Sequence, residues 1–183
     1  MAVQSNFNNL ETDLIDFSLK GTDEKLYSPS DFSDSEILII IFQCNHCPYV
    51  KAVTDRFVSL QEKYRDKRVQ LIGINPNDPV SYPEDSFDNM KLFAEKNKLN
   101  FPYLLDDTQE TARKYDAVCT PDIYVYDKNR KLRYRGRLDD SWKDESKITS
   151  RDLEKAVELL LDNKEIDFPQ IPSMGCSIKW KSS

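Results

Sequence analysis

The chain has 183 residues, a net charge of −6 and 39% hydrophobic residues, with acidic and basic side chains interspersed. This length allows one domain with a substantial core, and the composition is that of a folded, soluble protein. The acidic balance without a basic run argues against a nucleic-acid partner, and the longest apolar run is too short to span a bilayer. The four glycines are too scattered to form a glycine-rich phosphate-binding loop or a dinucleotide fingerprint.

The amino-terminal part of the chain predicts a leader, a hairpin and a central strand. Residues 1–9 are polar and lack the pattern of a signal peptide, so we expect a flexible leader and a cytoplasmic protein. Segments 16–19 and 24–27 flank a Lys-Gly-Thr-Asp stretch whose turn chemistry predicts a β-hairpin. Residues 36–43 form an apolar, β-branched run typical of a strand covered on both faces.

The rest of the chain alternates helical and extended patterns. In chain order we expect a helix after residue 47, a strand at 69–75, a helix at 85–99, an extended piece at 101–104, a short helix at 108–115, strands at 123–126 and 132–138, a helix at 151–162 and an extended tail from 164. Parallel strands joined by helices and followed by an antiparallel hairpin predict a three-layer α/β sandwich.

The strand at 132–138 alternates apolar residues with Arg133, Arg135 and Arg137. This pattern predicts a half-exposed edge strand whose arginines keep it soluble. A binding face for an anionic ligand is the alternative interpretation.

Cys44-Asn45-His46-Cys47 lies between the first buried strand and the first long helix. Two thiols three residues apart at such a junction are placed to make and break one disulfide. The positive end of the helix dipole also favours the thiolate, which is the form that attacks disulfides and peroxides. The alternative is a pair of inert, buried cysteines, which explains less well why the pair lies at the junction between a strand and a helix.

This order of elements resembles the thioredoxin fold, and the hairpin and the helix at 85–99 resemble its peroxiredoxin-like and TlpA-like branches. Residues 42–50, 119–122 and 175–181 resemble a group of alkyl hydroperoxide reductase/thiol-specific antioxidant proteins. The resemblance covers nearly the whole chain from residue 10 onward. It implies a central mixed β-sheet flanked by helices, with an N-terminal β-hairpin extension and an inserted helix.

The resemblance implies one domain at 10–183 that ends in an extended tail at 164–183. It also implies that Cys44 is the attacking thiol and that Cys47 resolves the mixed disulfide. His46 and the helix dipole would then hold the pKa of Cys44 well below its ordinary value of about 8.5.

Pro121 matches the cis-proline that thioredoxin-like proteins carry before their β-hairpin. This match implies that Thr120 packs against Cys44 and that the backbone beside it offers an edge to a substrate peptide. Cys119 would lie near Cys44 at the same substrate-binding position. One departure is Leu38, which replaces the buried acid that thioredoxins carry six residues before the first cysteine.

Cys176 is a possible second redox thiol, because it belongs to the tail segment that carries the resemblance. If the tail folds back, Cys119 and Cys176 could pair or relay electrons. A small buried residue at 119 and an incidental thiol at 176 are equally compatible with the sequence.

The predicted function is thiol–disulfide exchange with protein or small-thiol substrates. A thioredoxin-type or glutathione-type donor would supply the electrons. No cofactor, metal, nucleic-acid or membrane partner is implied. One alternative is a peroxiredoxin-like peroxidase. In peroxiredoxins the reactive cysteine precedes a proline, as Cys47 precedes Pro48, and a Thr or Ser lies three residues before it, where this chain has Cys44. The other is a redox-sensing or metal-binding module built from His46 and the four cysteines.

Overall fold

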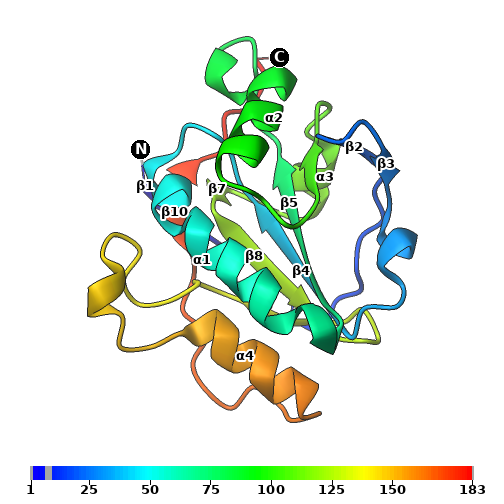
Figure 1. Ribbon diagram of the computed structural model, residues 1–183, viewed down its shortest axis with the longest axis vertical. Helices are drawn as coiled ribbons and strands as arrows, with labels where there is room; N and C mark the ends of the chain where they lie inside the picture. Colours follow the sequence, from blue (N-terminus) through cyan, green and yellow to red (C-terminus); the bar gives the residue numbers. More distant parts are fainter. Residues whose placement is uncertain (1, 7–9, 183) are drawn as a thin grey trace.

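The computed structural model describes residues 2–6 and 10–182 (Figure 1). Its centre is a seven-stranded mixed sheet in the order β3-β2-β6-β5-β4-β8-β9. Strand β4 (Ile37–Phe42) pairs in parallel with β5 (Val69–Asn75) and antiparallel with β8 (Asp122–Tyr126). Every residue of β4 is buried, which confirms the expectation of a strand covered on both faces.

The sheet extends outward from this centre in both directions. On one side β6 (Tyr103–Leu105) leads to the predicted hairpin of β2 (Leu19–Gly21) and β3 (Leu26–Tyr27), after which comes the short helix η1 (Pro29–Phe32). On the other side β9 (Leu132–Arg135) is the edge strand and pairs with β8.

Helices cover the two faces of the sheet. Helices α1 (Pro48–Tyr64) and α4 (Asp152–Leu161) lie side by side on one face (Figure 1). They pack on Ile39 and on the residues two positions before and after it in β4, whose side chains share that face. The other face of β4 packs on α3 (Glu110–Lys114). The layers are therefore those of the predicted three-layer sandwich.

The inserted helix is α2 (Phe87–Lys96), and single helical turns occur at η2 (Arg65–Lys67), η3 (Pro83–Asp85) and η4 (Glu145–Lys147). None of the helices in the described part of the chain is long and apolar enough to cross a membrane.

A second, three-stranded sheet joins the two ends of the chain. Its antiparallel strands are β1 (Ala2–Gln4), β10 (Met174–Ser177) and β7 (Cys119–Thr120), with β10 in the middle. The prediction of a loose leader at 1–9 is therefore wrong for residues 2–4, and residues 1 and 7–9 lie outside the described residues. The expected extended tail contains a paired strand. Backbone hydrogen bonding holds these short segments, and it leaves no side-chain pattern in the sequence.

The arginines of β9 do not form the exposed row that the alternation predicted. Arg135 is 2% exposed, and its guanidinium lies 3.4 Å from the Asp122 carboxylate and over the ring of Tyr124. Arg133 and Arg137 are also ion-paired, with Glu11 and Asp152 in that order. The expectation fails at Arg135 because a buried carboxylate compensates its charge.

Candidate functional site

The cysteine pair lies where β4 ends and α1 begins. Cys47 is the residue that caps the amino terminus of α1, and Pro48 takes the first helical position, where a missing N–H costs nothing. Both Cys44 and Cys47 are 0% exposed. The two thiols are therefore held inside the protein, at the positive end of a 17-residue helix.

Thr120 contacts both sulfur atoms. The peptide bond between Thr120 and Pro121 is cis, as the resemblance implied. The Thr120 hydroxyl lies 3.3 Å from Cys44 Sγ, and the Thr120 carbonyl oxygen lies 3.2 Å from Cys47 Sγ. The predicted placement of Thr120 against Cys44 is thus present in the structure.

The electrostatics of the pair favour the thiolate on Cys47 rather than on Cys44. The hydrogen bond from Cys44 lowers the pKa of Cys47 to about 4, with further help from the Cys176 thiol and the backbone amides of Val50 and Cys176. The shared hydrogen bond with Cys47, burial and the charge of Asp85 raise the pKa of Cys44. The sequence predicts the low pKa on Cys44, whereas the shared hydrogen bond and the charge of Asp85 favour the thiolate on Cys47.

The reason lies in the position of each sulfur. Cys47, as the capping residue, faces the backbone N–H of Val50 in the first turn of α1. Cys44 lies deeper and nearer a carboxylate, which disfavours a second negative charge. Burial raises the pKa of Cys47, and the Thr120 carbonyl beside it accepts a hydrogen bond from the thiol form, but the donors around this sulfur outweigh the burial.

His46 is oriented by Asp85, a residue that the sequence analysis did not single out. The imidazole Nδ1 donates to the Asp85 carboxylate at 2.6 Å, and the ring stacks on Tyr82 with centroids 5.4 Å apart. Asp85 is 0% exposed and also accepts hydrogen bonds from the Asn45 backbone N–H at 2.7 Å and from the Asn77 side chain at 2.7 Å.

Asp85 supplies the buried acid that Leu38 does not. It comes from η3, on a loop distant in sequence from the cysteines, and no local pattern marks it. One atom each of Cys44, His46 and Asp85 lie within 4.8 Å of one another, a set whose chemistry suits a transition metal. Three hydrogen-bond donors already engage the Asp85 oxygens, so hydrogen bonding accounts for the cluster.

The two remaining cysteines lie on neighbouring strands and face different ways. Cys176 is opposite Thr120 in the pairing of β10 with β7, whereas Cys119 is opposite Ser177. Successive residues of a strand point to opposite faces, so Cys176 shares a face with Thr120 and Cys119 does not. Cys176 packs against the cluster that holds Cys44 and Cys47, and the Cys119 thiol donates to the Pro121 carbonyl at 3.6 Å. A pairing of Cys119 with Cys176 is therefore disfavoured.

A small apolar cavity of about 140 Å³ adjoins the cis-proline. Its walls include Tyr49, Pro121, Trp142 and Met174, and the rings of Tyr49 and Trp142 are 4.0 Å apart. The sequence left the place of Trp142 undecided. The structure puts this side chain beside the residues that flank the cysteine pair.

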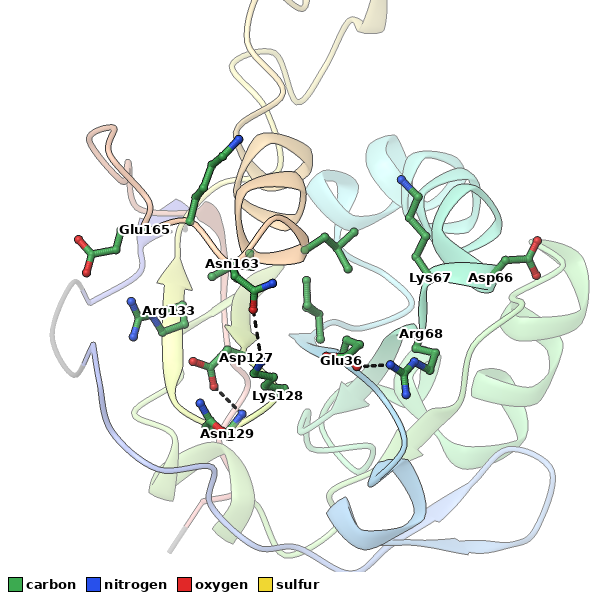
Figure 2. Close-up of a pocket in the computed structure, with 14 residues that line it drawn as sticks. Glu36, Asp66, Lys67, Arg68, Asp127, Lys128, Asn129, Arg133, Asn163 and Glu165 are labelled. Carbon is green, nitrogen blue, oxygen red and sulfur yellow. Dashed lines mark hydrogen bonds and ion pairs between the residues drawn. The ribbon is translucent and has the colours of Figure 1, made fainter.

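The larger cavity, of about 690 Å³, lies at the opposite end of the sheet (Figure 2). Glu36, which lines it, precedes β4, whereas Cys44 follows β4, so about 20 Å of strand separates the two places. Figure 2 shows that its charged and polar side chains bond one another, as in the pairs Glu36–Arg68 and Lys128–Asn163. This cavity is not part of the thiol site.

Several solved structures share the fold of this chain. An uncharacterized conserved protein from Geobacillus kaustophilus is 43% identical, with a TM-score of 0.94 and coverage of 100% of this chain and 98% of that one. The thioredoxin domain of a thiol-disulfide oxidoreductase from Bacteroides vulgatus has a TM-score of 0.66 at 16% identity, over 85% of this chain and 99% of that one. This second likeness shows the fold, and it confirms the thioredoxin-like architecture expected from the sequence.

The curated relatives are peroxiredoxins. Peroxiredoxin Q, chloroplastic, from Gentiana triflora is 25% identical over 120 residues, which are 62% of this chain and 52% of that protein. The chain thus spans about half the length of the curated relatives it matches. The model of the AhpC/TSA family matches residues 10–135, more than half of the chain. This protein therefore belongs to the AhpC/TSA family, the peroxiredoxin-like branch of the thioredoxin superfamily.

Proposed function

We propose that this protein is a thiol–disulfide oxidoreductase whose redox-active pair is Cys44 and Cys47. The observation that carries the proposal is the burial of the two thiols in one cluster against Thr120, whose hydroxyl lies 3.3 Å from Cys44 Sγ and whose carbonyl oxygen lies 3.2 Å from Cys47 Sγ. Thiols in contact can form one disulfide by giving up two electrons and two protons. Membership of the AhpC/TSA family supports thiol-based redox chemistry.

Cys47 is the proposed attacking group, which reverses the roles implied by the resemblance. Its thiolate attacks a substrate disulfide, bonds to one sulfur and releases the other as a thiolate, which takes up a proton. Cys44 then attacks Cys47, so that the Cys44–Cys47 disulfide forms and the second substrate sulfur leaves with the proton that Cys44 loses. The substrate disulfide is reduced to two thiols while the pair is oxidised, and the reverse sequence oxidises a substrate dithiol.

His46 is the proposed proton acceptor for Cys44. Its ring lies in the cluster in which Cys44, His46 and Asp85 atoms are within 4.8 Å of one another. The hydrogen bond to Asp85 fixes the ring, so Asp85 is a positioning residue in this proposal.

The proposed substrates are proteins or small molecules that carry a disulfide or a dithiol. Thr120 contacts the cysteine pair, and its neighbour Pro121 lines the apolar cavity, which suits an apolar side chain next to the reacting sulfur. A thioredoxin-type or glutathione-type donor would return the electrons, in the cytoplasm.

A glutathione redox series followed by mass-spectrometric mapping of alkylated cysteines tests the proposed pair. We expect one reversible Cys44–Cys47 disulfide with a defined midpoint, lost in both Cys44→Ser and Cys47→Ser. The proposal is wrong if these two thiols never pair at any potential, or if they are protected until a chelator is added.

A second candidate function is a thiol peroxidase centred on Cys47. The observation that favours it is the low pKa of Cys47 at the capping position immediately before Pro48. A peroxide would oxidise the Cys47 thiolate to a sulfenic acid and release water or an alcohol. Trapping of a sulfenic acid on Cys47 after peroxide treatment, absent in Cys47→Ser, would support this function.

A further inference from the structure

The redox pair is closed off from solvent by the carboxy-terminal strand. Cys44 and Cys47 are 0% exposed, and β10 lies beside the amino-terminal end of α1, where the pair is located (Figure 1). A disulfide in solution has no direct path to either sulfur while β10 is in place, so the proposed attack by Cys47 needs a step that brings a substrate sulfur past β10. Cys176, on β10, is half-buried and is the most exposed of the four cysteines.

Backbone pairing holds β10 on the edge of β7 next to the cis-proline. Cys176 is opposite Thr120, and the Ile178 backbone N–H donates to the Val118 carbonyl at 3.0 Å. A Cβ atom at Gly175 would lie 2.0 Å from the Thr120 carbonyl oxygen, so this close approach requires glycine. The edge that a substrate peptide would use is thus occupied by a segment of the chain itself.

Cys176 presents its sulfur directly to Cys47. The Cys176 side chain packs against the buried cluster of Cys44, Cys47 and Val50, and its thiol and backbone N–H both help to lower the pKa of Cys47. Cys176 therefore stands where the cysteine of a bound substrate would stand, with one face toward Cys47 and one toward solvent.

We propose that Cys176 is a relay thiol, through which the buried pair exchanges electrons with disulfides in solution by way of a Cys47–Cys176 disulfide. This inference rests on the proposed oxidoreductase function of the same site. It assigns a chemical role to the carboxy-terminal segment, which otherwise only covers the pair.

The relay balances in atoms and electrons. Cys176 first passes its proton to the Cys47 thiolate and then attacks a low-molecular-weight disulfide. A mixed disulfide forms on Cys176, and one thiolate leaves and takes the proton from Cys47. Cys47 then attacks the Cys176 sulfur, forms the Cys47–Cys176 disulfide and releases the second thiolate. Attack of Cys44 on Cys47 closes the buried disulfide, and Cys176 takes up the proton of Cys44. Two protein thiols are oxidised and one external disulfide is reduced.

Oxidation by glutathione disulfide, followed by mapping of the disulfides, tests the relay. In Cys44→Ser the relay stops at its intermediate, so we expect a Cys47–Cys176 disulfide that is absent in Cys44→Ser/Cys176→Ser. In Cys176→Ser, formation of the Cys44–Cys47 disulfide should slow by roughly tenfold or more, because the accessible thiol is gone. Ser177→Ala, the next residue of the same strand, whose side chain points to the opposite face, is the matched control and should oxidise at the unaltered rate.

Two results would overturn the relay. One is that Cys44→Ser carries glutathione on Cys47 alone after oxidation. The other is that the Cys44–Cys47 disulfide forms in Cys176→Ser as fast as in the unaltered protein. A separate result bears on the proposed function. If the unaltered protein forms no Cys44–Cys47 disulfide even with the strong oxidant diamide, the redox pair itself is wrong, whatever Cys44→Ser shows.

Discussion

The carboxylate of Asp85 accepts a hydrogen bond from His46 Nδ1 at 2.6 Å, and the same carboxylate accepts the backbone N–H of Asn45 at 2.7 Å. One buried acid thus holds both residues that separate Cys44 from Cys47. Its negative charge also contributes to the raised pKa of Cys44. The spacing and the electrostatics of the cysteine motif are therefore set in part by a residue from another loop.

Asp85→Asn should lower the pKa of Cys44, because the substitution removes a nearby negative charge. The alkylation rate of Cys44 as a function of pH, compared between Cys47→Ser and Cys47→Ser/Asp85→Asn, measures this shift. The free energy of unfolding should fall by about 1–3 kcal/mol, since Asn satisfies the three donors less well. Asp88→Asn, an exposed acid on α2, is the control and should change neither quantity. An unchanged Cys44 profile would remove Asp85 from its positioning role.

Cys47 should be a thiolate at neutral pH. Its pKa in the folded protein is about 4, below the ordinary value, so the thiolate is present above that pH and is lost as the pH falls through it. Ultraviolet absorbance of the thiolate, with Cys47→Ser as the blank, follows this titration without a need for reagent access. Cys44→Ala removes the largest cause of the shift and should raise the midpoint. A midpoint at or above about 8.5 in the unaltered protein would contradict the assignment.

Gly175→Ala should open the redox pair to solvent. The added Cβ atom would meet the Thr120 carbonyl, so β10 cannot keep its place on β7. Native-state alkylation of Cys44 and Cys47 by iodoacetamide should be faster than in the unaltered protein, at a cost to stability of about 1–3 kcal/mol. Met174→Ala, on the same strand, should label at the original rate. Equal labelling of Gly175→Ala and the unaltered protein would show that β10 does not cover the pair.

Arg135→Met should destabilise the fold strongly. Arg135 and Asp122 are 2% and 0% exposed, so the substitution leaves a buried carboxylate without its cation, at a cost of about 3–5 kcal/mol. Arg133→Met on the same strand is the matched control. Its side chain is 25% exposed and pairs with Glu11 at the surface, so it should change stability by about 1 kcal/mol or less. Urea unfolding of both variants measures the difference, and equal losses would refute the assignment of a buried ion pair.

The sequence by itself determined the main sheet, the long helices and the location of the cysteine pair. An apolar run such as 36–43 and the helical spacing that follows it are properties of contiguous residues, so they are readable without the fold. The junction between them places Cys44 and Cys47 at the start of α1 whatever the rest of the chain does. The match of Pro121 to a family position likewise needs only local sequence.

Only the tertiary structure decided how the pair is protonated and what covers it. The low pKa of Cys47 depends on donors from three segments, and the raised pKa of Cys44 depends on Asp85 from a distant loop. Strands β1 and β10 are held by backbone hydrogen bonds, which most side chains allow, so apart from Gly175 their sequences carry no signal. Burial, charge and pairing between segments far apart in the chain are properties of the assembled fold, and they decide which thiol reacts and through which neighbour.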